Sequence, residues 1–340
     1  MIANYCLSRP LISICMPTLN RCDYACKALL SIYNQAEAHH AIEVTISNNC
    51  SDHNYDLLEG LLDKCPEDLS LGYTIQKNRL TLDEHMHALV NLAKGRYVYY
   101  LGDDDYFLDE QLILLVELVV RYLPDLAIFN GRLVDESGEM IGKHFYLPEK
   151  IYTCINEAFL DLRDKGTFGA VLVRREYLDD ASFKALIGTS HAYGCFWLSL
   201  LRVYNSLGSC CIIIPGFELV ALRMAEKSYS KLIVYFRDIP YELAVYQRHL
   251  PPGSPQRLNY AFARRYYRRV TSFYFLASLY ASGSPLHELA NINPSVYMRT
   301  RVQILISKIL VRTGFYNMLC KLKPLFKLWL PEFIRMIKER

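Results

Sequence analysis

The first third of the chain alternates between short apolar runs and segments of helical spacing. Four runs rich in Ile, Val, Leu and Tyr have the composition of buried strands: 11–16, 42–47, 71–76 and 97–101. Three segments between them place apolar side chains three or four positions apart and are predicted as helices: 21–33, 51–62 and 81–93. Because strands and helices alternate over short links, we expect a parallel sheet with helices on both faces.

Local signals mark the ends of the predicted helices. Ser51 or Asp52 is expected to cap the second helix, because a short polar side chain accepts a hydrogen bond from its first free N–H groups. Thr81 with Glu84 three residues later is the pattern of a capping box. Gly95 is expected to follow the third helix as its left-handed C′ residue.

Beyond residue 130 the alternation is less regular. Residues 131–147 alternate as a hairpin does, and further strands are predicted at 169–173 and 210–222. A loop followed by a helix is expected over 188–207. From residue 227 onward the segments are long and helical, with breaks at 251–255, 283–285 and 294.

Charge separates the end of the chain from the rest. Hydrophobic residues make up 52% of the 340 positions, enough for a large core, and the net charge is only +3. Residues 257–340 nevertheless contain fifteen Lys or Arg and three acids, so the remainder is net acidic. An acidic body with a basic, aromatic end indicates a segment that meets an anionic surface.

Cysteine usage and the start of the chain bear on its compartment. The eleven cysteines include no CxxC pair and have no regular spacing, which favours reduced, buried side chains. The first residues lack a charged region followed by an apolar stretch, and no run of about 18 apolar residues occurs. We expect a cytoplasmic protein without a signal peptide or a membrane span.

Three consecutive acids, Asp103, Asp104 and Asp105, directly follow the fourth predicted strand. Adjacent carboxylates repel one another unless a cation or hydrogen-bond donors compensate. Mg²⁺ or Mn²⁺ fits such a place, because these ions take a few protein oxygens and complete their shell with ligand phosphates. A solvated acidic turn before a helix near Asp109 is the alternative.

Polar loops follow the other three strands as well. After the first strand, which we expect to end at Pro17, Thr18 and Asn20 offer hydrogen bonds to a base or ribose, and Arg21 offers a charge to a phosphate. Residues 47–52, which include Asn48, follow the second strand. Each loop alone is compatible with an ordinary turn or cap.

The loop after the third strand contains Lys77, Asn78 and Arg79, with Asp83 shortly beyond. Ligands of open α/β sheets bind beyond the carboxyl ends of the strands. Since four successive strands are each followed by a polar loop at that edge, we expect one ligand crevice there.

The motifs PTLNR, SNNCSD and AKGRYVYYLGDDD, in this order, resemble glycosyltransferase family 2, whose members have the GT-A fold. The resemblance covers roughly the first 130 residues. It implies that Thr18 and Asn48 meet the nucleobase, that Asp103 or Asp104 faces the ribose, and that Asp103 and Asp105 bind a divalent cation, Mn²⁺ or Mg²⁺. Many members have Asp in place of Asn48.

The polar loops and the resemblance together give a larger set of expected site residues. Asp104 and Asp105 belong to its catalytic part. The donor-binding set consists of Pro17, Thr18, Asn20, Arg21, Asn48, Asn78, Asp83, Asp103, Asp104 and Arg223.

A weaker resemblance to O-antigen abequosyltransferases rests on residues 187–193, the strand to Arg223 and the helix after Arg264. Those enzymes add a 3,6-dideoxyhexose from a CDP-sugar to a lipid-linked oligosaccharide. Many inverting members of the wider family have a Glu-Asp pair near the acceptor, where this chain has Gly-Thr-Ser-His. His191 is therefore a candidate proton acceptor, with a structural hydrogen bond as the alternative. The stereochemical course stays open.

The basic end of the chain mixes cations with aromatic and aliphatic residues. Residues 261–270 interleave Arg with Phe and Tyr, and 304–330 carry Lys308, Arg312, Lys321, Lys323, Lys327 and Trp329. This composition is typical of an interfacial helix on anionic lipid. A helical appendage packed on the protein is the alternative, and nucleic acid is not expected because no nucleic-acid module is present.

These observations predict an α/β protein with a GT-A (Rossmann-like), mostly parallel sheet and a C-terminal helical segment. Residues 1–225 would form the catalytic domain, with donor binding in 1–130 and the acceptor side in 131–225, and 226–340 a basic, membrane-associating region. The expected function is sugar transfer from a nucleoside-diphosphate sugar to a polyprenyl-diphosphate-linked oligosaccharide, at the inner face of a bacterial membrane. A sugar-phosphate nucleotidyltransferase and a non-catalytic binding subunit are the alternatives.

Overall fold

The computed structural model describes residues 9–204, 209–224 and 231–316. The chain forms two compact units, Met1–Lys227 with Ala244–Asn259, and Ser228–Leu243 with Tyr260–Arg340. Residues 244–259, which we expected in the basic helical region, therefore group with the first unit.

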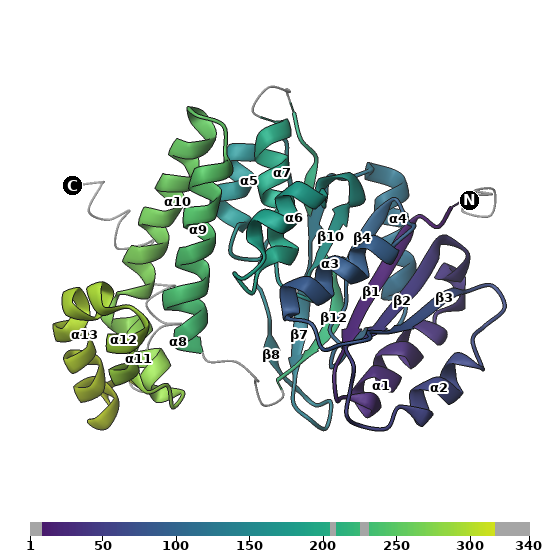
Figure 1. Cartoon of the computed structure of the whole chain (residues 1–340), viewed down its shortest axis with the longest axis horizontal. Coiled ribbons are helices and arrows are strands. Elements are labelled where there is room, and N and C mark those ends of the chain that lie inside the picture. The colour runs from purple at the N-terminus through teal and green to yellow at the C-terminus, as the bar shows by residue number, and fades with distance from the viewer. Residues whose placement is uncertain (1–8, 205–208, 225–230, 317–340) are drawn as a thin grey trace, which may run out of the picture. The chain divides into compact units, whose positions relative to one another are not determined.

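An eight-stranded sheet in the order β3-β2-β1-β4-β10-β6-β11-β9 is the centre of the first unit (Figure 1). Its first four strands are mutually parallel: β1 (Ile12–Thr18), β2 (Ile42–Asn48), β3 (Ser70–Ile75) and β4 (Tyr97–Tyr100). The other half contains β6 (Leu126–Ile128), β9 (Lys150–Tyr152), β10 (Val171–Arg174) and β11 (Ile212–Ile214). Because β10 and β9 run antiparallel to their neighbours, the sheet is mixed, and the predicted fold class is confirmed.

A second, four-stranded sheet has the order β5-β12-β7-β8. It contains β5 (Tyr106–Phe107), β7 (Asn130–Val134), β8 (Met140–Lys143) and β12 (Glu218–Arg223). The antiparallel pairing of β7 with β8 confirms the predicted hairpin. Strand β5 was not predicted, since two residues are too short a run to show a period, yet it holds the exit of the acidic loop against β12.

Alternate residues of β1 serve the two faces of the large sheet. Ile12, Ile14 and Met16 join a core with residues from α1 (Cys22–Tyr33), α2 (Asp56–Leu62) and α4 (Gln111–Tyr122). Helix α3 (Leu82–Leu92) contacts β1 and β2 and lies in front of the sheet in Figure 1. The period of two in a strand thus buries β1 on both sides, as its continuous apolar run predicts.

Three local predictions are corrected by the structure. Strand β1 continues through Pro17, which pairs with Ser47 of β2. On the β4 side the register ends at Cys15, so the missing N–H of Pro17 costs no ladder bond. Helix α2 begins at Asp56 rather than near residue 51, so neither Ser51 nor Asp52 is its cap.

Gly95 is also not the left-handed residue that we expected after α3. It is absent from the residues with positive φ, and a Cβ atom there would lie 2.6 Å from the backbone nitrogen of Ser13. Gly95 is therefore required by close contact with β1 rather than by its own backbone angles. The capping box of α3 is confirmed, with Thr81 and Glu84 exchanging hydrogen bonds.

The remaining helices of the first unit are α5 (Ile155–Leu162), α6 (Asp180–Leu186) and α7 (Phe196–Val203). The second unit contains α8 (Lys231–Ile233), α11 (Phe273–Ala281), α12 (Leu289–Ile292) and α13 (Pro294–Arg312). Helices α9 (Ile239–His249) and α10 (Ser254–Val270) contribute residues to both units. Within the described ranges, no helix is both long and apolar enough to span a membrane. The nine cysteines of those ranges are all free.

Candidate functional site

The acidic loop after β4 is largely buried. Asp103 is 7% exposed and Asp105 is 6% exposed. Arg21, from the loop after β1, places Nη1 3.3 Å from Oδ1 of Asp103 and 2.9 Å from Oδ2 of Asp104. Residues separated by about eighty positions are therefore brought together because β1 and β4 are parallel neighbours.

Burial leaves the negative charge of this loop only partly compensated. Burial raises the pKa of Asp103 to about 6, and the attraction of Arg21 opposes this rise. Burial, followed by the charge of Asp104, raises the pKa of Asp105 well above its usual range, against one hydrogen bond from the backbone N–H of Arg223. Two carboxyl groups with raised pKa values beside a third mark a place where a cation is stabilising.

The donor set of this loop fits a divalent cation with few protein ligands. Carboxylate oxygens are the ligands that Mg²⁺ and Mn²⁺ prefer. In the described part of the chain, however, no three His, Cys, Asp or Glu side chains converge as a complete protein cage. A cation held by Asp103 and Asp105 would therefore depend on a ligand's oxygens for the rest of its shell.

The loops after β1 and β2 are tied to each other. The backbone N–H of Asn20 donates to Ser51 Oγ at 3.0 Å, and the N–H of Asp52 donates to Asn20 Oδ1 at 2.8 Å. Asn48 is buried, and its Oδ1 accepts the N–H of Ser51 at 2.9 Å. The amide-rich sequence thus builds the walls of the crevice, and the contact of Asn48 with a base stays a prediction.

Two tyrosines complete these walls and were missed in the sequence. Tyr55 shares a hydrogen bond of 2.7 Å with Thr18 Oγ1 and accepts the N–H of Arg21 at 3.1 Å. Tyr73 accepts a hydrogen bond from Nδ2 of Asn48 at 3.2 Å. Tyr55 was missed because we expected it to lie inside a helix over 51–62, whereas α2 begins at Asp56, the residue after Tyr55.

Asp83 lies at the start of α3. Its side chain does not line the open part of the crevice but binds a loop that lies more than a hundred positions later in the chain. Its carboxylate accepts three backbone N–H groups, from Gly188 at 2.8 Å, Ser190 at 2.9 Å and Ala192 at 3.0 Å. The side chain is 2% exposed. Its donor-binding role stays a prediction, while its contacts show that it positions the loop of His191.

His191 is presented by this loop. Its Nδ1 lies 2.9 Å from the carbonyl oxygen of Thr189, so Nδ1 carries the proton and donates it. This leaves Nε2 as the acceptor nitrogen of the neutral ring. The ring centroid of His191 lies 6.1 Å from that of Tyr193. The ring centroid of Tyr193 in turn lies 6.0 Å from that of Tyr100 at the end of β4. The His191 loop therefore adjoins the strand that leads into the acidic loop.

Arg223 closes β12 beside the acidic loop and is 8% exposed. Its Nη1 donates to the carbonyl oxygens of Asp135 at 3.0 Å and Glu136 at 2.6 Å, and Nε donates to that of Asp104 at 3.3 Å. The guanidinium thus braces the acidic loop against the β7–β8 hairpin.

Gly169 lies next to the same acidic loop, and the sequence did not indicate it as a site residue. Its φ is +71°, and a Cβ atom there would lie 2.6 Å from Cδ2 of Leu222 and 3.0 Å from Oδ2 of Asp105. The backbone angle therefore favours glycine, and any other residue would also have to displace the ends of the Leu222 and Asp105 side chains.

Asn78 is exposed in the loop after β3, and no described hydrogen bond holds its side chain. The neighbouring Arg79 pairs with Asp52 at 2.6 Å, which joins the third loop to the second. Pro17 lies inside β1, so it contributes backbone position rather than a polar group. Of the predicted residues, Asn78 is thus the least tied to the others.

Strained backbone gathers in these loops. Five described non-glycine residues have positive φ: Asn20 at 58° and Cys50 at 57° belong to the crevice loops, and Ser190 at 61° belongs to the His191 loop. Each such residue costs on the order of 1–3 kcal/mol, and such strain is found mainly at functional sites. The loops are therefore held by their contacts in shapes that their own preferences disfavour.

Solved structures share this architecture. S. aureus TarS 1–349 in complex with UDP aligns with a TM-score of 0.55 and 13% identity, over 90% of this chain and 91% of that chain. The mannosyltransferase PcManGT from Pyrobaculum calidifontis, in complex with GDP-Man and Mn²⁺, aligns with a TM-score of 0.51 and 14% identity, over 89% and 87%. At these identities the likeness shows the fold, which is that of a GT-A glycosyltransferase.

Sequence comparisons give the family. The profile described as Glycosyl transferase family 2 matches residues 13–180. Abequosyltransferase RfbV of Salmonella typhimurium (strain LT2) is 35% identical over 240 residues, 65% of this chain and 69% of that protein. The putative teichuronic acid biosynthesis glycosyltransferase TuaG of Bacillus subtilis (strain 168) is 26% identical over 144 residues, 42% of this chain and 55% of that protein. The chain belongs to glycosyltransferase family 2.

This assignment confirms the resemblance seen in the sequence and decides between the alternatives. The protein is a glycosyltransferase, similar to an abequosyltransferase, rather than a nucleotidyltransferase or a non-catalytic subunit.

Proposed function

We propose that this enzyme transfers a sugar, a deoxyhexose, from a nucleoside-diphosphate donor to a lipid-linked oligosaccharide during assembly of a bacterial surface glycan. The observation that carries the proposal is the convergence of the loops after β1, β2 and β4 around Arg21 and the three acids. The choice of a deoxyhexose and of a surface glycan is supported by the names of the two relatives. The donor base follows from no contact and is left to the experiment below.

The reaction exchanges two bonds at the anomeric carbon. The acceptor hydroxyl oxygen forms a bond to that carbon while the bond to the diphosphate oxygen breaks, and the electron pair leaves with the nucleoside diphosphate. A divalent cation bound by Asp103 and Asp105 would supply positive charge at the departing diphosphate. Arg21 lies within reach of the same place and would exchange part of its pairing with Asp104 for the donor phosphates.

His191 is the proton acceptor in this proposal. Its Nδ1 is occupied as a donor to Thr189, so Nε2 is the nitrogen that takes the hydroxyl proton as the new bond forms. Asp83 fixes the loop through three hydrogen bonds and so acts as a positioning residue. Replacing His191 by Gln should lower kcat with little change in the KM of the donor, while a purely structural histidine would leave kcat nearly unchanged.

An anionic membrane surface is the proposed location of the acceptor, and α13 provides the contact. Four of its apolar side chains are exposed at positions that share one helix face: Met298 at 58%, Val302 at 60%, Leu305 at 60% and Ile309 at 51%. The buried residues Thr300, Ile304 and Ser307 lie on the opposite face. Arg301, Lys308 and Arg312 flank the exposed stripe, which is the arrangement of an interfacial helix.

Helix α10 does not share this arrangement, although its sequence suggested it. Phe262, Tyr266 and Val270 are buried, with 3%, 2% and 0% exposure, so its apolar face already packs within the protein. Its arginines remain exposed. The predicted contributions of Lys321, Lys323, Lys327 and Trp329 lie outside the described residues.

A vesicle flotation assay with anionic and neutral lipids tests the membrane contact. Leu305→Asp should weaken binding to anionic vesicles by about tenfold, because it puts a charge into the apolar stripe. Leu57→Asp, at an equally exposed leucine of α2, is the matched control and should bind as the wild type does. Equal binding by both variants would remove α13 from the proposal.

Thermal unfolding with UDP, GDP, CDP and dTDP, each with and without Mn²⁺, tests the donor site. One nucleotide should raise the unfolding temperature in the presence of Mn²⁺, and Asp105→Asn should lose this response. Asp109→Asn, an exposed acid four residues later, should keep it. If none of the four nucleotides stabilises the folded protein, the donor class proposed here is wrong.

A further inference from the structure

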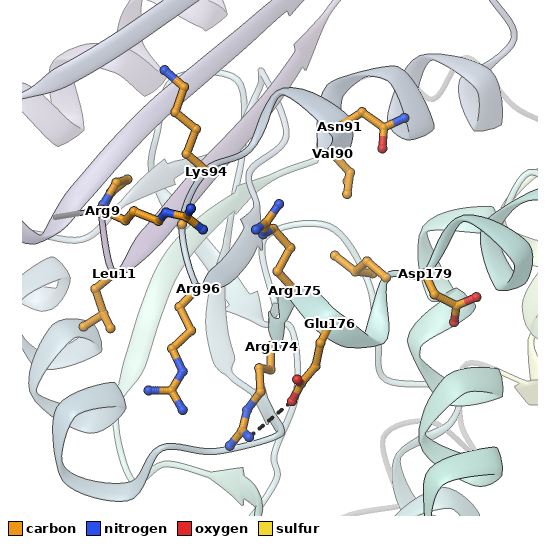
Figure 2. A pocket seen from close by; sticks show the side chains of 13 residues that line it. Arg9, Leu11, Val90, Asn91, Lys94, Arg96, Arg174, Arg175, Glu176 and Asp179 are labelled. Atoms are coloured by element: carbon orange, nitrogen blue, oxygen red, sulfur yellow. Dashed lines mark hydrogen bonds and ion pairs between the residues drawn. The ribbon is translucent and has the colours of Figure 1, made fainter. Parts of the chain in front are cut away.

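A second pocket lies at the opposite edge of the large sheet, at the amino ends of β1 and β4 (Figure 2). Its volume is about 660 Å³. Its walls come from the residues before β1, the turn from α3 into β4, and the end of the antiparallel strand β10. None of these residues belongs to the donor crevice.

Backbone contacts hold the walls together. The N–H of Arg96 donates to the carbonyl of Pro10 at 3.4 Å, and the N–H of Arg175 donates to the carbonyl of Arg96 at 2.9 Å. Beneath the turn, the buried carboxylate of Glu43 accepts the N–H groups of Lys94 and Gly95. The side chains of this pocket therefore project from a fixed frame.

The lining is strongly basic. Five cations face two acids, Glu176 and Asp179. Arg174 is neutralised by Asp125 at 3.4 Å and Glu176 at 3.3 Å, and Asp179 is used as the cap of α6. Among the described residues, no carboxylate forms an ion pair with the other four cations, Arg9, Lys94, Arg96 and Arg175.

The directions of two of these side chains favour the binding of a ligand in the pocket. In Figure 2, Arg9 and Arg175 extend toward the middle of the pocket, whereas Lys94 and Arg96 extend away from it in different directions. Arg175 donates one Nη1 bond of 3.2 Å to the carbonyl of Ala93 at the end of α3, which leaves its other donors available. Like charges around one cavity repel one another, and an anion bound between them relieves this repulsion.

We propose that this pocket binds an anionic ligand that carries phosphate groups. Arginine forks bind phosphate oxygens in pairs, and the volume exceeds what a single phosphate needs. The same chemistry is presented by free diphosphate and by the headgroup of an anionic phospholipid. The proposal is independent of the donor and the acceptor, because it uses the other edge of the sheet.

Two probes distinguish the sources. Calorimetric titration with inorganic diphosphate in EDTA tests the free ligand, since without a metal the acidic loop repels it. Vesicles of phosphatidylglycerol, compared with phosphatidylcholine, test the headgroup. The test variant is Arg9→Glu/Arg175→Glu, which reverses the two cations that point into the pocket, and the matched control is Lys27→Glu/Lys64→Glu, which makes the same charge change at exposed sites on α1 and after α2.

The pocket variant should bind at least one probe about tenfold more weakly than the control variant does, because two phosphate contacts are reversed in charge. Loss with diphosphate identifies a free phosphate ligand, and loss only with phosphatidylglycerol identifies a lipid headgroup. If the two double variants bind each probe equally, or the wild type binds neither, the proposal is overturned.

Discussion

The two edges of the eight-stranded sheet are built in opposite ways from the same strands. At the carboxyl edge, Asp103 and Asp105 are buried, their pKa values are raised, and neighbouring loops hold residues with positive φ. At the amino edge, Lys94, Arg96 and Arg175 are exposed, and none of the three has a positive φ. The carboxyl edge thus contains buried, partly uncompensated negative charge and strained backbone, whereas the charges of the amino edge are exposed to water.

This difference predicts where substitutions cost stability. Removing a group on which the carboxyl edge depends leaves buried partners unsatisfied, while the amino edge has solvent to replace what is removed. A function that depends on strong electrostatic interactions is better placed at the carboxyl edge, because a buried, less polar environment strengthens each interaction between charges.

Asp83→Ala should have the largest effect on stability. The change removes the acceptor of three N–H groups, of which that of Ala192 is buried and those of Gly188 and Ser190 are partly buried, and we expect a loss of about 3 kcal/mol in the free energy of unfolding. Urea denaturation measures it, with Glu117→Ala, an exposed acid of α4, as the control that should change little. A loss below about 1 kcal/mol would show that the loop of His191 does not depend on Asp83.

The raised pKa of Asp103 should give a characteristic pH dependence in metal-free protein. Since the folded-state pKa of about 6 exceeds the ordinary pKa of an aspartate, the folded state binds the proton more tightly than the unfolded state does. The contribution of Asp103 to stability should therefore be fully present below about pH 4 and be lost as the pH rises through about 6, by about 2–3 kcal/mol.

Asp103→Asn isolates this contribution from other titrating groups. The difference in unfolding free energy between wild type and variant should fall with rising pH in EDTA, and the fall should be smaller with saturating Mn²⁺. A difference that stays flat from pH 4 to 7 would mean that Asp103 is not destabilised by its burial.

Gly169→Ala should cost less, about 1–2 kcal/mol, through its positive φ and the contact with Leu222. Because the new Cβ atom also presses on Asp105, the stabilisation by nucleotide and Mn²⁺ should weaken as well. The control is Gly60→Ala in α2, where no atom lies within 4 Å of the new Cβ, and it should be stabilising by about 0.5–1 kcal/mol.

The smallest effect is expected at the amino edge. Lys94→Glu/Arg96→Glu should change the free energy of unfolding by no more than about 0.5 kcal/mol, since both side chains are exposed. Thermal unfolding in the absence of anions measures this change. A large loss would erase the contrast between the edges and indicate that the basic side chains support the fold.

Much of this fold is readable from the sequence because its signals are local. The four parallel strands, the capping box of Thr81 and Glu84 and the hairpin after residue 130 each follow from periodicity or capping chemistry within a few residues. The acidic loop was found for the same reason, since three consecutive acids after a strand form a local pattern.

The predictions that were wrong concern contacts between distant segments. Gly95 was given a local role, yet it is fixed by Ser13 of another strand. The start of α2 was placed too early because Ser51 and Asp52 look like caps, whereas both bind Asn20 across the crevice. In α10 the aromatic residues suggested a lipid contact, but Phe262 and Tyr266 are buried.

The sequence by itself determined the order of strands and helices, the position of the acidic loop and the family, because these depend on residue type and short-range spacing. Only the tertiary structure decided what those residues do to one another. In the folded protein, Arg21 forms an ion pair with Asp103, Asp83 binds the loop of His191, and cations without carboxylate partners line a pocket at the opposite edge of the sheet. The reason is physical: burial, charge compensation and hydrogen-bond partners are properties of neighbours in space, and hydrogen-bonded neighbours here are as many as 119 positions apart in the chain.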